Sequence, residues 1–313
     1  TSFASNVAPG TDANTPVFYR FQESTGNPGG SGAMWQESTT LTDTGLSPNT
    51  QYGYRAQARD SAPRKNTTKW STPSYAYTLC NSPLAPSLYD PSPTKIYVTV
   101  PDDGNPNSAD YAVYVDTLGK YVAEDGSLSA SAYYNERYFW TDRRIKGRSS
   151  GTSYSVKVKA RNSDGVDTGF GPAASLSTLA ADTQDPVITG SYTVPTWVKE
   201  GAPGTTAVTV TGNDRTTGGS DIVTGEFYLG ADPGEGHGTA AISAGGGNDP
   251  VETVTFVVNT ASWTIADSPY DFYGRVKDEA GHWSAPYHLE IQVVDATPPT
   301  AITDLHAQTL ASL

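Results

Sequence analysis

The sequence predicts an all-β chain of three tandem β-sandwich domains followed by one further strand. Glycine and proline account for 31 and 22 of the 313 residues, and 19 tyrosines accompany them. Such a composition is typical of short strands separated by turns, and long helical patterns are missing. One strand pattern also recurs three times, at spacings that suit domains of about 100 residues. The predicted domains are 1–80, 81–180 and 183–295, with a linker and extending strand at 296–313.

The recurring pattern is clearest at residues 46–58, which read LSPNTQYGYRAQA. From Tyr52 onward, period-two alternation places aromatic and small residues on one face of a strand and Arg and Gln on the other. The same alternation follows Tyr154 and Tyr270 without gaps. Three copies of one strand in phase indicate a tandem array of related sandwiches.

Residues 46–58 resemble the fibronectin type III pattern, in which a leucine and a proline precede a tyrosine-corner residue. The resemblance implies structural roles for Tyr52, Tyr154 and Tyr270, whose hydroxyls would bond to the upstream backbone. It covers residues 1–180 well and implies two fibronectin type III-like domains of a secreted or cell-surface protein. Residues 183–295 resemble an immunoglobulin-like sandwich more loosely.

The first domain departs from this pattern because it lacks room for its opening strand. Only residues 1–8 precede Pro9, whereas the second domain has a full strand at 85–89 ahead of the strand that ends at Pro101. A sandwich without an edge strand exposes unpaired backbone that invites pairing with another strand. We therefore expect Phe3, Ser5 and Val7 to form an acceptor strand.

The C-terminal segment has the sequence of a missing opening strand. Residues 296–313 read ATPPTAITDLHAQTLASL, with Ile302, Leu305, Ala307 and Leu310 as the apolar residues of a donor strand. Burying about three large aliphatic side chains contributes on the order of 5–9 kcal/mol before ordering costs. Strand addition between copies uses two different surfaces, so the contact need not close and gives a fibre. The alternative is a sequence cut inside a longer tandem array, which predicts the same two ends.

Composition restricts the partners. A formal net charge of −13 and a pI near 4.6 argue against a nucleic-acid partner and fit a secreted protein. No apolar run approaches the roughly 18 residues of a membrane helix, so membrane insertion is not expected. Cys80 is the single cysteine and is expected to be a small buried residue, with an interchain bridge or a reactive thiol as the alternatives. The chain starts at Thr1, and its one methionine is Met34. We therefore expect a processed chain or a fragment.

No catalytic constellation is recognisable, and the protein is expected not to be an enzyme. The four histidines follow no zinc spacing, and no nucleophile elbow or carboxylate pair stands out. No cofactor is predicted. If the chain binds an ion, calcium is a better candidate than zinc, because Asp182, Asp185 and Asp295 lie at linkers and residues 102–105 form an acidic turn. Ordinary turn and cap roles are the favoured interpretation of these residues.

Two further sites are surface hypotheses. Residues 133–145 form an aromatic and basic insertion, in which Tyr133, Tyr138, Phe139 and Trp140 provide either a glycan-binding surface or a cover for the sheet. Trp283 is a second candidate sugar contact. Asn66 begins an Asn-Thr-Thr sequon on a predicted loop, which makes it a possible glycosylation site.

These observations favour an extracellular structural subunit that assembles head to tail by strand exchange into a filament or surface layer. The runner-up is a tandem spacer or adhesion segment of a larger secreted protein, such as a carbohydrate-active enzyme or a sugar-binding protein. A sugar-binding module is the third hypothesis. The expected partners are further copies of the chain, and surface glycans are a second candidate class of partner.

Overall fold

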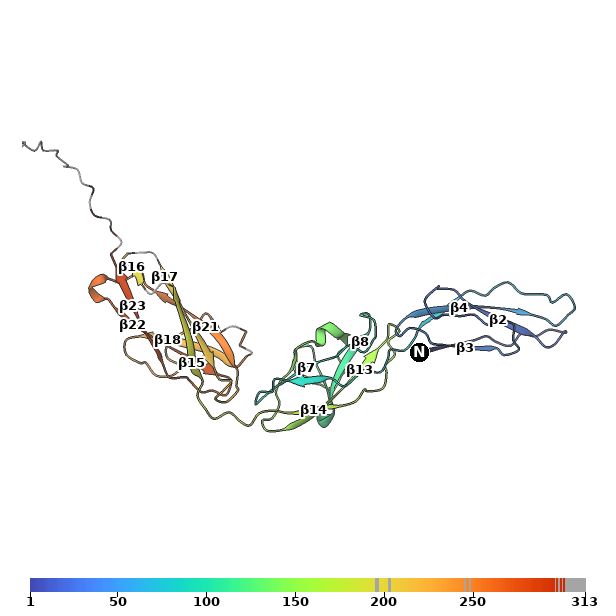
Figure 1. The fold of residues 1–313 in the computed structure, drawn as a ribbon, viewed down its shortest axis with the longest axis horizontal. Coiled ribbons are helices and arrows are strands. Elements are labelled where there is room, and N and C mark those ends of the chain that lie inside the picture. The colour runs from blue at the N-terminus through green and yellow to red at the C-terminus, as the bar shows by residue number, and fades with distance from the viewer. Residues whose placement is uncertain are drawn as a thin grey trace, which may run out of the picture. The chain divides into compact units, whose positions relative to one another are not determined.

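The structure is a computed structural model that describes residues 1–194, 197–201, 204–244, 246–247, 249–295, 297, 299 and 301. Strands dominate these residues, and single 3-10 turns are the helical elements found there. The chain divides into two compact units, residues 1–180 and 181–313. The first unit contains a first sandwich (residues 2–77) and a second sandwich (87–177), and the second unit contains a third sandwich (187–294) (Figure 1).

The first sandwich consists of a two-stranded and a three-stranded sheet. β1 (Ser2–Asn6) pairs antiparallel with β3 (Thr40–Thr44), with Phe3 opposite Asp43. The other sheet has the order β2-β4-β5, formed by β2 (Phe18–Glu23), β4 (Gln51–Arg59) and β5 (Ser74–Tyr77). Its buried side chains form two small clusters: Tyr19, Phe21 and Ala56 in one, and Leu46, Tyr52 and Tyr54 in the other.

The second sandwich has a three-stranded sheet against a larger one. The first sheet has the order β12-β7-β6, formed by β6 (Ser87–Tyr89), β7 (Ile96–Thr99) and β12 (Arg143–Ile145). The second has the order β10-β9-β8-β13-β14, with β11 also paired to β8. Its members are β8 (Asp110–Val115), β9 (Lys120–Val122), β10 (Leu128–Ser129), β11 (Asn135–Glu136), β13 (Ser153–Arg161) and β14 (Ala174–Ser177). The 3-10 turns are η1 (Asp116–Leu118) and η2 (Arg137–Trp140).

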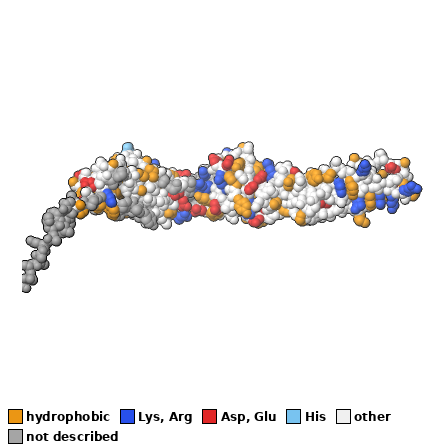
Figure 2. Space-filling model, turned by 90° about the horizontal axis from the view of Figure 1, so that it is seen from above, with side chains coloured by type: hydrophobic (Ala, Val, Ile, Leu, Met, Phe, Trp, Pro, Cys, Tyr) orange, Lys and Arg blue, Asp and Glu red, His pale blue; other side chains and the backbone are white. Residues whose placement is uncertain are grey.

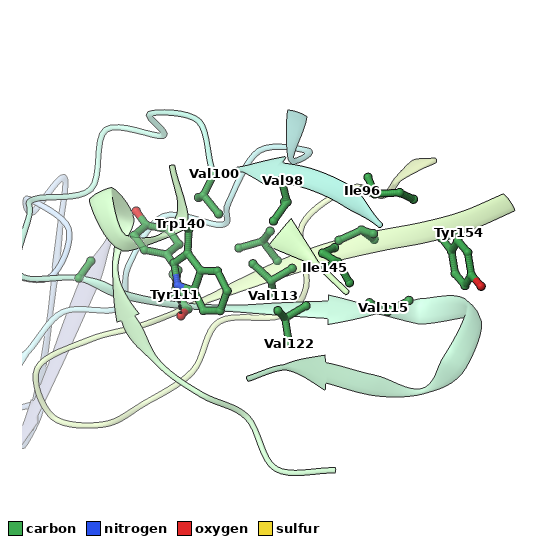
Figure 3. Packing of buried hydrophobic residues seen from close by; sticks show 14 of the residues in the cluster. Ile96, Val98, Val100, Tyr111, Val113, Val115, Val122, Trp140, Ile145 and Tyr154 are labelled. Carbon is green, nitrogen blue, oxygen red and sulfur yellow. Dashed lines mark hydrogen bonds between the residues drawn. The ribbon is translucent and has the colours of Figure 1, made fainter. Parts of the chain in front are cut away.

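The core of the second sandwich is the most complete of the first unit. Its cluster holds fifteen buried residues (Figure 3). Most of them are the inward-facing residues of strands along which buried and less buried positions alternate. Along β13, Tyr154, Val156, Val158 and Ala160 are buried while the intervening residues are half-exposed. Trp140 enters this core from η2 with its side chain fully buried, and its indole N–H donates to the Tyr111 carbonyl at 2.9 Å.

The third sandwich has a four-stranded and a five-stranded sheet. The order β15-β17-β21-β20 joins β15 (Val187–Val194), β17 (Thr205–Asn213), β20 (Ser243–Ala244) and β21 (Val251–Asn259). The order β16-β23-β22-β18-β19 joins β16 (Trp197–Lys199), β18 (Ile222–Leu229), β19 (Thr239–Ala240), β22 (Tyr270–Asp278) and β23 (Tyr287–Val294). The turn η3 (Ile265–Asp267) precedes β22.

The surface carries charges of both signs. On the face drawn in Figure 2, acidic and basic side chains are interspersed with polar and hydrophobic ones, without a continuous basic stripe. Among the described residues, no helix has the length and apolar character needed to cross a membrane.

Trp140→Ala is expected to lower the free energy of unfolding by about 3–5 kcal/mol, because it leaves a large cavity in a packed core and removes the partner of a buried carbonyl. Urea denaturation of the full chain measures this change. Tyr138→Ala is the matched control, since Tyr138 is 60% exposed on the same turn and its loss should change stability by less than about 0.5 kcal/mol. Equal effects of the two substitutions would contradict the core role of Trp140.

Candidate functional site

The open edge of β1 is the candidate functional site of the first sandwich. Phe3, Ser5 and Val7 are half-buried, while the residues between them are exposed. Val7 N–H donates to the Thr39 carbonyl at 3.0 Å, and the Thr1 carbonyl accepts from Leu46. The odd-numbered residues therefore direct their backbone groups toward β3. Since alternate residues of a strand point to opposite edges, Ser2, Ala4 and Asn6 present theirs to the other edge.

The second sandwich shows what occupies this edge elsewhere in the chain. There, β7 holds the place of β1 and β12 holds the place of β3, and β6 pairs with the other edge of β7 through Leu88 opposite Val98. β6 also lies against β14, the last strand of the facing sheet. Among the described residues of the first sandwich, no strand pairs with the corresponding edge of β1. This edge of β1 is therefore open in the part of the chain that the structure describes.

A groove of about 220 Å³ opens just past the end of β1. It is lined by the residues that follow β1, the inward face of β4 and the segment before β5, with contributions from Val7, Tyr19, Ala56, Ala58 and Ser71. Ala56 is buried and Ala58 is only half-buried, although both face the interior. The groove therefore exposes part of the space between the two sheets.

A close backbone contact at Gly171 shows that the groove lies where the segment leading into β6 runs in the second sandwich. Ser71 N–H donates to Ala56 O, and Gly171 N–H donates to Val158 O, each at 2.8 Å, so Ser71 and Gly171 occupy equivalent positions. A Cβ at Gly171 would lie 2.2 Å from the Pro83 carbonyl oxygen, because the segment leading into β6 crosses directly over it. In the first sandwich, the groove lies over Ser71 instead.

The predicted donor residues Ile302, Leu305, Ala307 and Leu310 lie outside the described residues. Their pairing with the open edge of β1 stays a prediction. The acceptor residues Phe3, Ser5 and Val7 have side chains turned toward the first core, where the Phe3 and Tyr54 ring centroids are 4.9 Å apart. What β1 offers another strand is accordingly its backbone edge together with the adjoining groove.

The three motif tyrosines occupy corresponding places in the three sandwiches. The Tyr52 hydroxyl accepts from Ser47 N–H at 3.1 Å, and the Tyr154 hydroxyl accepts from Ser149 N–H at 2.8 Å. The Tyr270 hydroxyl accepts from the backbone of Thr264 at 3.1 Å. Each bond fixes the turn that precedes the central strand, which is the geometry of a tyrosine corner.

The aromatic insertion does not form the sugar platform that its sequence allows. Trp140 is fully buried and Phe139 packs against it edge-on, with ring centroids 5.1 Å apart. Tyr133 also packs against this core. A role for Trp140 in glycan contact is therefore wrong, because its ring faces the interior. In the third sandwich, Trp283 is half-buried under the cations of Arg275 and Lys277.

The remaining predicted residues have structural partners. Asn66 is exposed, and its side-chain N–H donates to Asp60 Oδ2 at 2.8 Å, so its glycosylation stays a prediction. Cys80 is buried in the second core, and burial raises the pKa of its thiol to about 11. In the acidic turn at 102–105, the Asp103 carboxylate accepts from the Asn105 N–H and the Tyr111 hydroxyl, which is a turn and cap role.

A hydrogen-bonded joint connects the first two sandwiches. The Asn162 side-chain N–H₂ donates to the carbonyls of Tyr77 at 3.3 Å and Thr78 at 3.2 Å. Asp164 Oδ2 accepts from Tyr77 N–H at 2.6 Å, and Asn49 Oδ1 accepts from Ser163 N–H at 2.8 Å. Asn49 and Asn162 are each only 4% exposed, so these bonds are shielded from water. No sequence pattern marked these residues, since each reads as an ordinary turn residue.

Comparison with known proteins gives one sequence relative. No protein-family model matches the chain. Exoglucanase B of Cellulomonas fimi is 27% identical in a 278-residue match that covers 84% of this chain and 22% of that protein. The chain thus spans about a fifth of the length of this relative.

Solved structures of tandem domains are also similar. A two-domain fibronectin type III segment of chicken tenascin matches with a TM-score of 0.35 and 17% identity, over 57% of this chain and 93% of that one. The central fibronectin-III array of RIM-binding protein matches with a TM-score of 0.25 and 15% identity, over 93% and 91%. The strand order and the tyrosine corners described above are those of tandem fibronectin type III-like β-sandwiches.

Proposed function

We propose that the chain is a non-enzymatic spacer segment of a larger extracellular protein. The observation that carries this proposal is the joint between the first two sandwiches, because a spacer must resist bending where its domains meet. Asn49 and Asn162 are buried there, and a buried amide contributes only when its hydrogen bonds are made. The joint therefore favours one arrangement of the two sandwiches over a freely moving link.

The relation to Exoglucanase B supports the same proposal. That protein is several times longer than the matched region, so a region of this kind exists there within a much larger chain. The name of the relative refers to an enzyme, and we propose that the present chain carries no catalytic role of its own. An acidic surface with net charge −13 is compatible with a solvated segment between other domains.

Asn162→Asp is the sharpest test of the joint. Aspartate keeps the oxygen that accepts from the Asp164 and Val166 N–H groups, but it loses the N–H₂ that reaches the first sandwich. The two sandwiches are expected to stay folded while their relative motion increases. Spin labels at Lys69→Cys and Lys120→Cys, both exposed positions, should then give a broader distance distribution by pulsed electron resonance.

The matched control is Asp60→Asn, which makes the reverse exchange at the equivalent turn of the first sandwich, away from the joint. Its label-to-label distribution should stay as narrow as that of the parent chain. If Asn162→Asp leaves the distribution equally narrow, the joint does not hold the two sandwiches and the spacer proposal loses its support.

Head-to-tail assembly by strand exchange is the second candidate function. The unpaired edge of β1 and the groove beside it favour it, since together they match the place that β6 fills in the second sandwich. In this candidate, residues 300–313 of one copy add to the edge of β1 in the next. The contact joins different surfaces and extends into a filament.

Ala4→Pro tests this candidate at the acceptor. The Ala4 N–H faces the open edge, so proline there leaves the β1–β3 ladder intact and removes a donor needed by an incoming strand. Electron microscopy should show fibres for the parent chain and none for Ala4→Pro. Deletion of residues 300–313 should have the same effect.

Ser5→Pro is the control, because its N–H faces β3 and its loss should destabilise the first sandwich, as measured by circular dichroism. The strand-exchange candidate is excluded if the chain that lacks residues 300–313 still forms fibres, or if the parent chain forms none. Neither result bears on the joint.

A further inference from the structure

Two carboxylates and one imidazole converge at the start of the third sandwich. Asp182 precedes β15, Asp278 ends β22, and His282 lies in the turn that follows. One ligand atom from each lies within 4.8 Å of the other two. All three belong to the second compact unit, so one folded body sets their geometry.

Asp278 and His282 are held firmly in this cluster. Asp278 is 1% exposed, and its Oδ1 accepts from the N–H groups of Gly281 at 2.7 Å and His282 at 2.8 Å. Its Oδ2 lies 3.2 Å from His282 Nδ1. These bonds explain Asp278 and His282 as the cap of a turn. They do not explain why a third group from a distant segment is brought against them.

Asp182 is that third group. Its Oδ1 accepts from Gln184 N–H at 3.0 Å, while its Oδ2 is buried without a hydrogen-bond partner among the described residues. A Cβ at Gly218 would lie 1.7 Å from Oδ1 and 2.4 Å from Oδ2, so the carboxylate occupies the space that a side chain there would fill. A buried carboxylate oxygen without a partner is costly unless a cation compensates it.

A further buried carboxyl group, that of Asp214, lies beside Asp182. Asp214 is completely buried, with Oδ2 accepting from Ser220 N–H at 2.6 Å and Oδ1 facing the Thr217 hydroxyl.

We propose that Asp182, Asp278 and His282 form a divalent-cation site, with Asp214 beside it. Calcium prefers the carboxylate oxygens, and manganese and zinc accept the imidazole nitrogen as well. The bound ion would fasten the segment before β15 to the end of β22. The predicted calcium residues Asp185 and Asp295 are exposed and lie outside this cluster.

The test is titration calorimetry of the chelator-treated full chain with Ca²⁺, Mn²⁺ and Zn²⁺, together with scanning calorimetry. At least one ion is expected to bind with one equivalent and to raise the unfolding temperature of the third sandwich. His282→Gln distinguishes a calcium site from a manganese or zinc site. Calcium binding should persist in this variant, while binding of manganese or zinc should weaken.

Two variants challenge the site without touching the turn at Asp278. Asp182→Asn removes one charge, and Gly218→Ala keeps every donor but displaces the Asp182 carboxylate. Each should weaken binding about tenfold or more, a loss of roughly 1.4 kcal/mol or more. Asp185→Asn, a neutralised carboxylate three residues along the same segment, should bind like the parent chain.

The proposal is overturned if the folded parent chain binds none of the three ions at millimolar concentration, the weak end of extracellular calcium sites. It is also overturned if Asp182→Asn and Asp185→Asn behave alike. Circular dichroism of each variant establishes that it is folded. If Gly218→Ala binds an ion as well as the parent chain does, that ion binds elsewhere and the proposal is also overturned.

Discussion

The structure depends on one long alternating strand in each sandwich, buried on its inward face and tied down at its start. β4, β13 and β22 each span nine residues, and each begins at or next to a tyrosine whose hydroxyl accepts a backbone N–H from the preceding turn. Alternation gives the strand one apolar face, and the tyrosine bond fixes which residue starts it. A one-residue slip would turn the apolar face to solvent, so the neighbouring strands take their register from this one.

The residue at or directly after the end of this strand connects the sites described above. Asp60, Asn162 and Asp278 stand at the same position in the three sandwiches, and each accepts backbone N–H groups of the turn that follows. The second polar atom of each side chain, Oδ2 of the two aspartates and Nδ2 of Asn162, has a different partner in each sandwich. It bonds the Asn66 side chain in the first sandwich, reaches the preceding sandwich in the second, and faces an imidazole in the third. The amide at this repeated position thus distinguishes the joint from the plain turn and the candidate ion site, which both have an aspartate there.

The sandwiches and their tyrosines could be predicted because the necessary pattern lies within about ten neighbouring residues. The burial of Trp140 could not be predicted, since an irregular aromatic insertion has no period that tells which ring points inward. The groove escaped prediction because Ala56 and Ala58 alternate in the same way whether or not a strand covers them. Asp182 was recognised as acidic, but only folding brings it to Asp278 and His282.

Burial of Cys80 links the reactivity of its thiol to the folding of the second sandwich. The thiol lies in the core of the second sandwich, just after the joint, and its raised pKa keeps it protonated and unreactive at neutral pH. Chemical modification of Cys80 therefore requires that core to open. In an oxidising environment, each opening exposes a thiol that can form a covalent link to another chain. Modification of this one cysteine therefore reports unfolding of the second core.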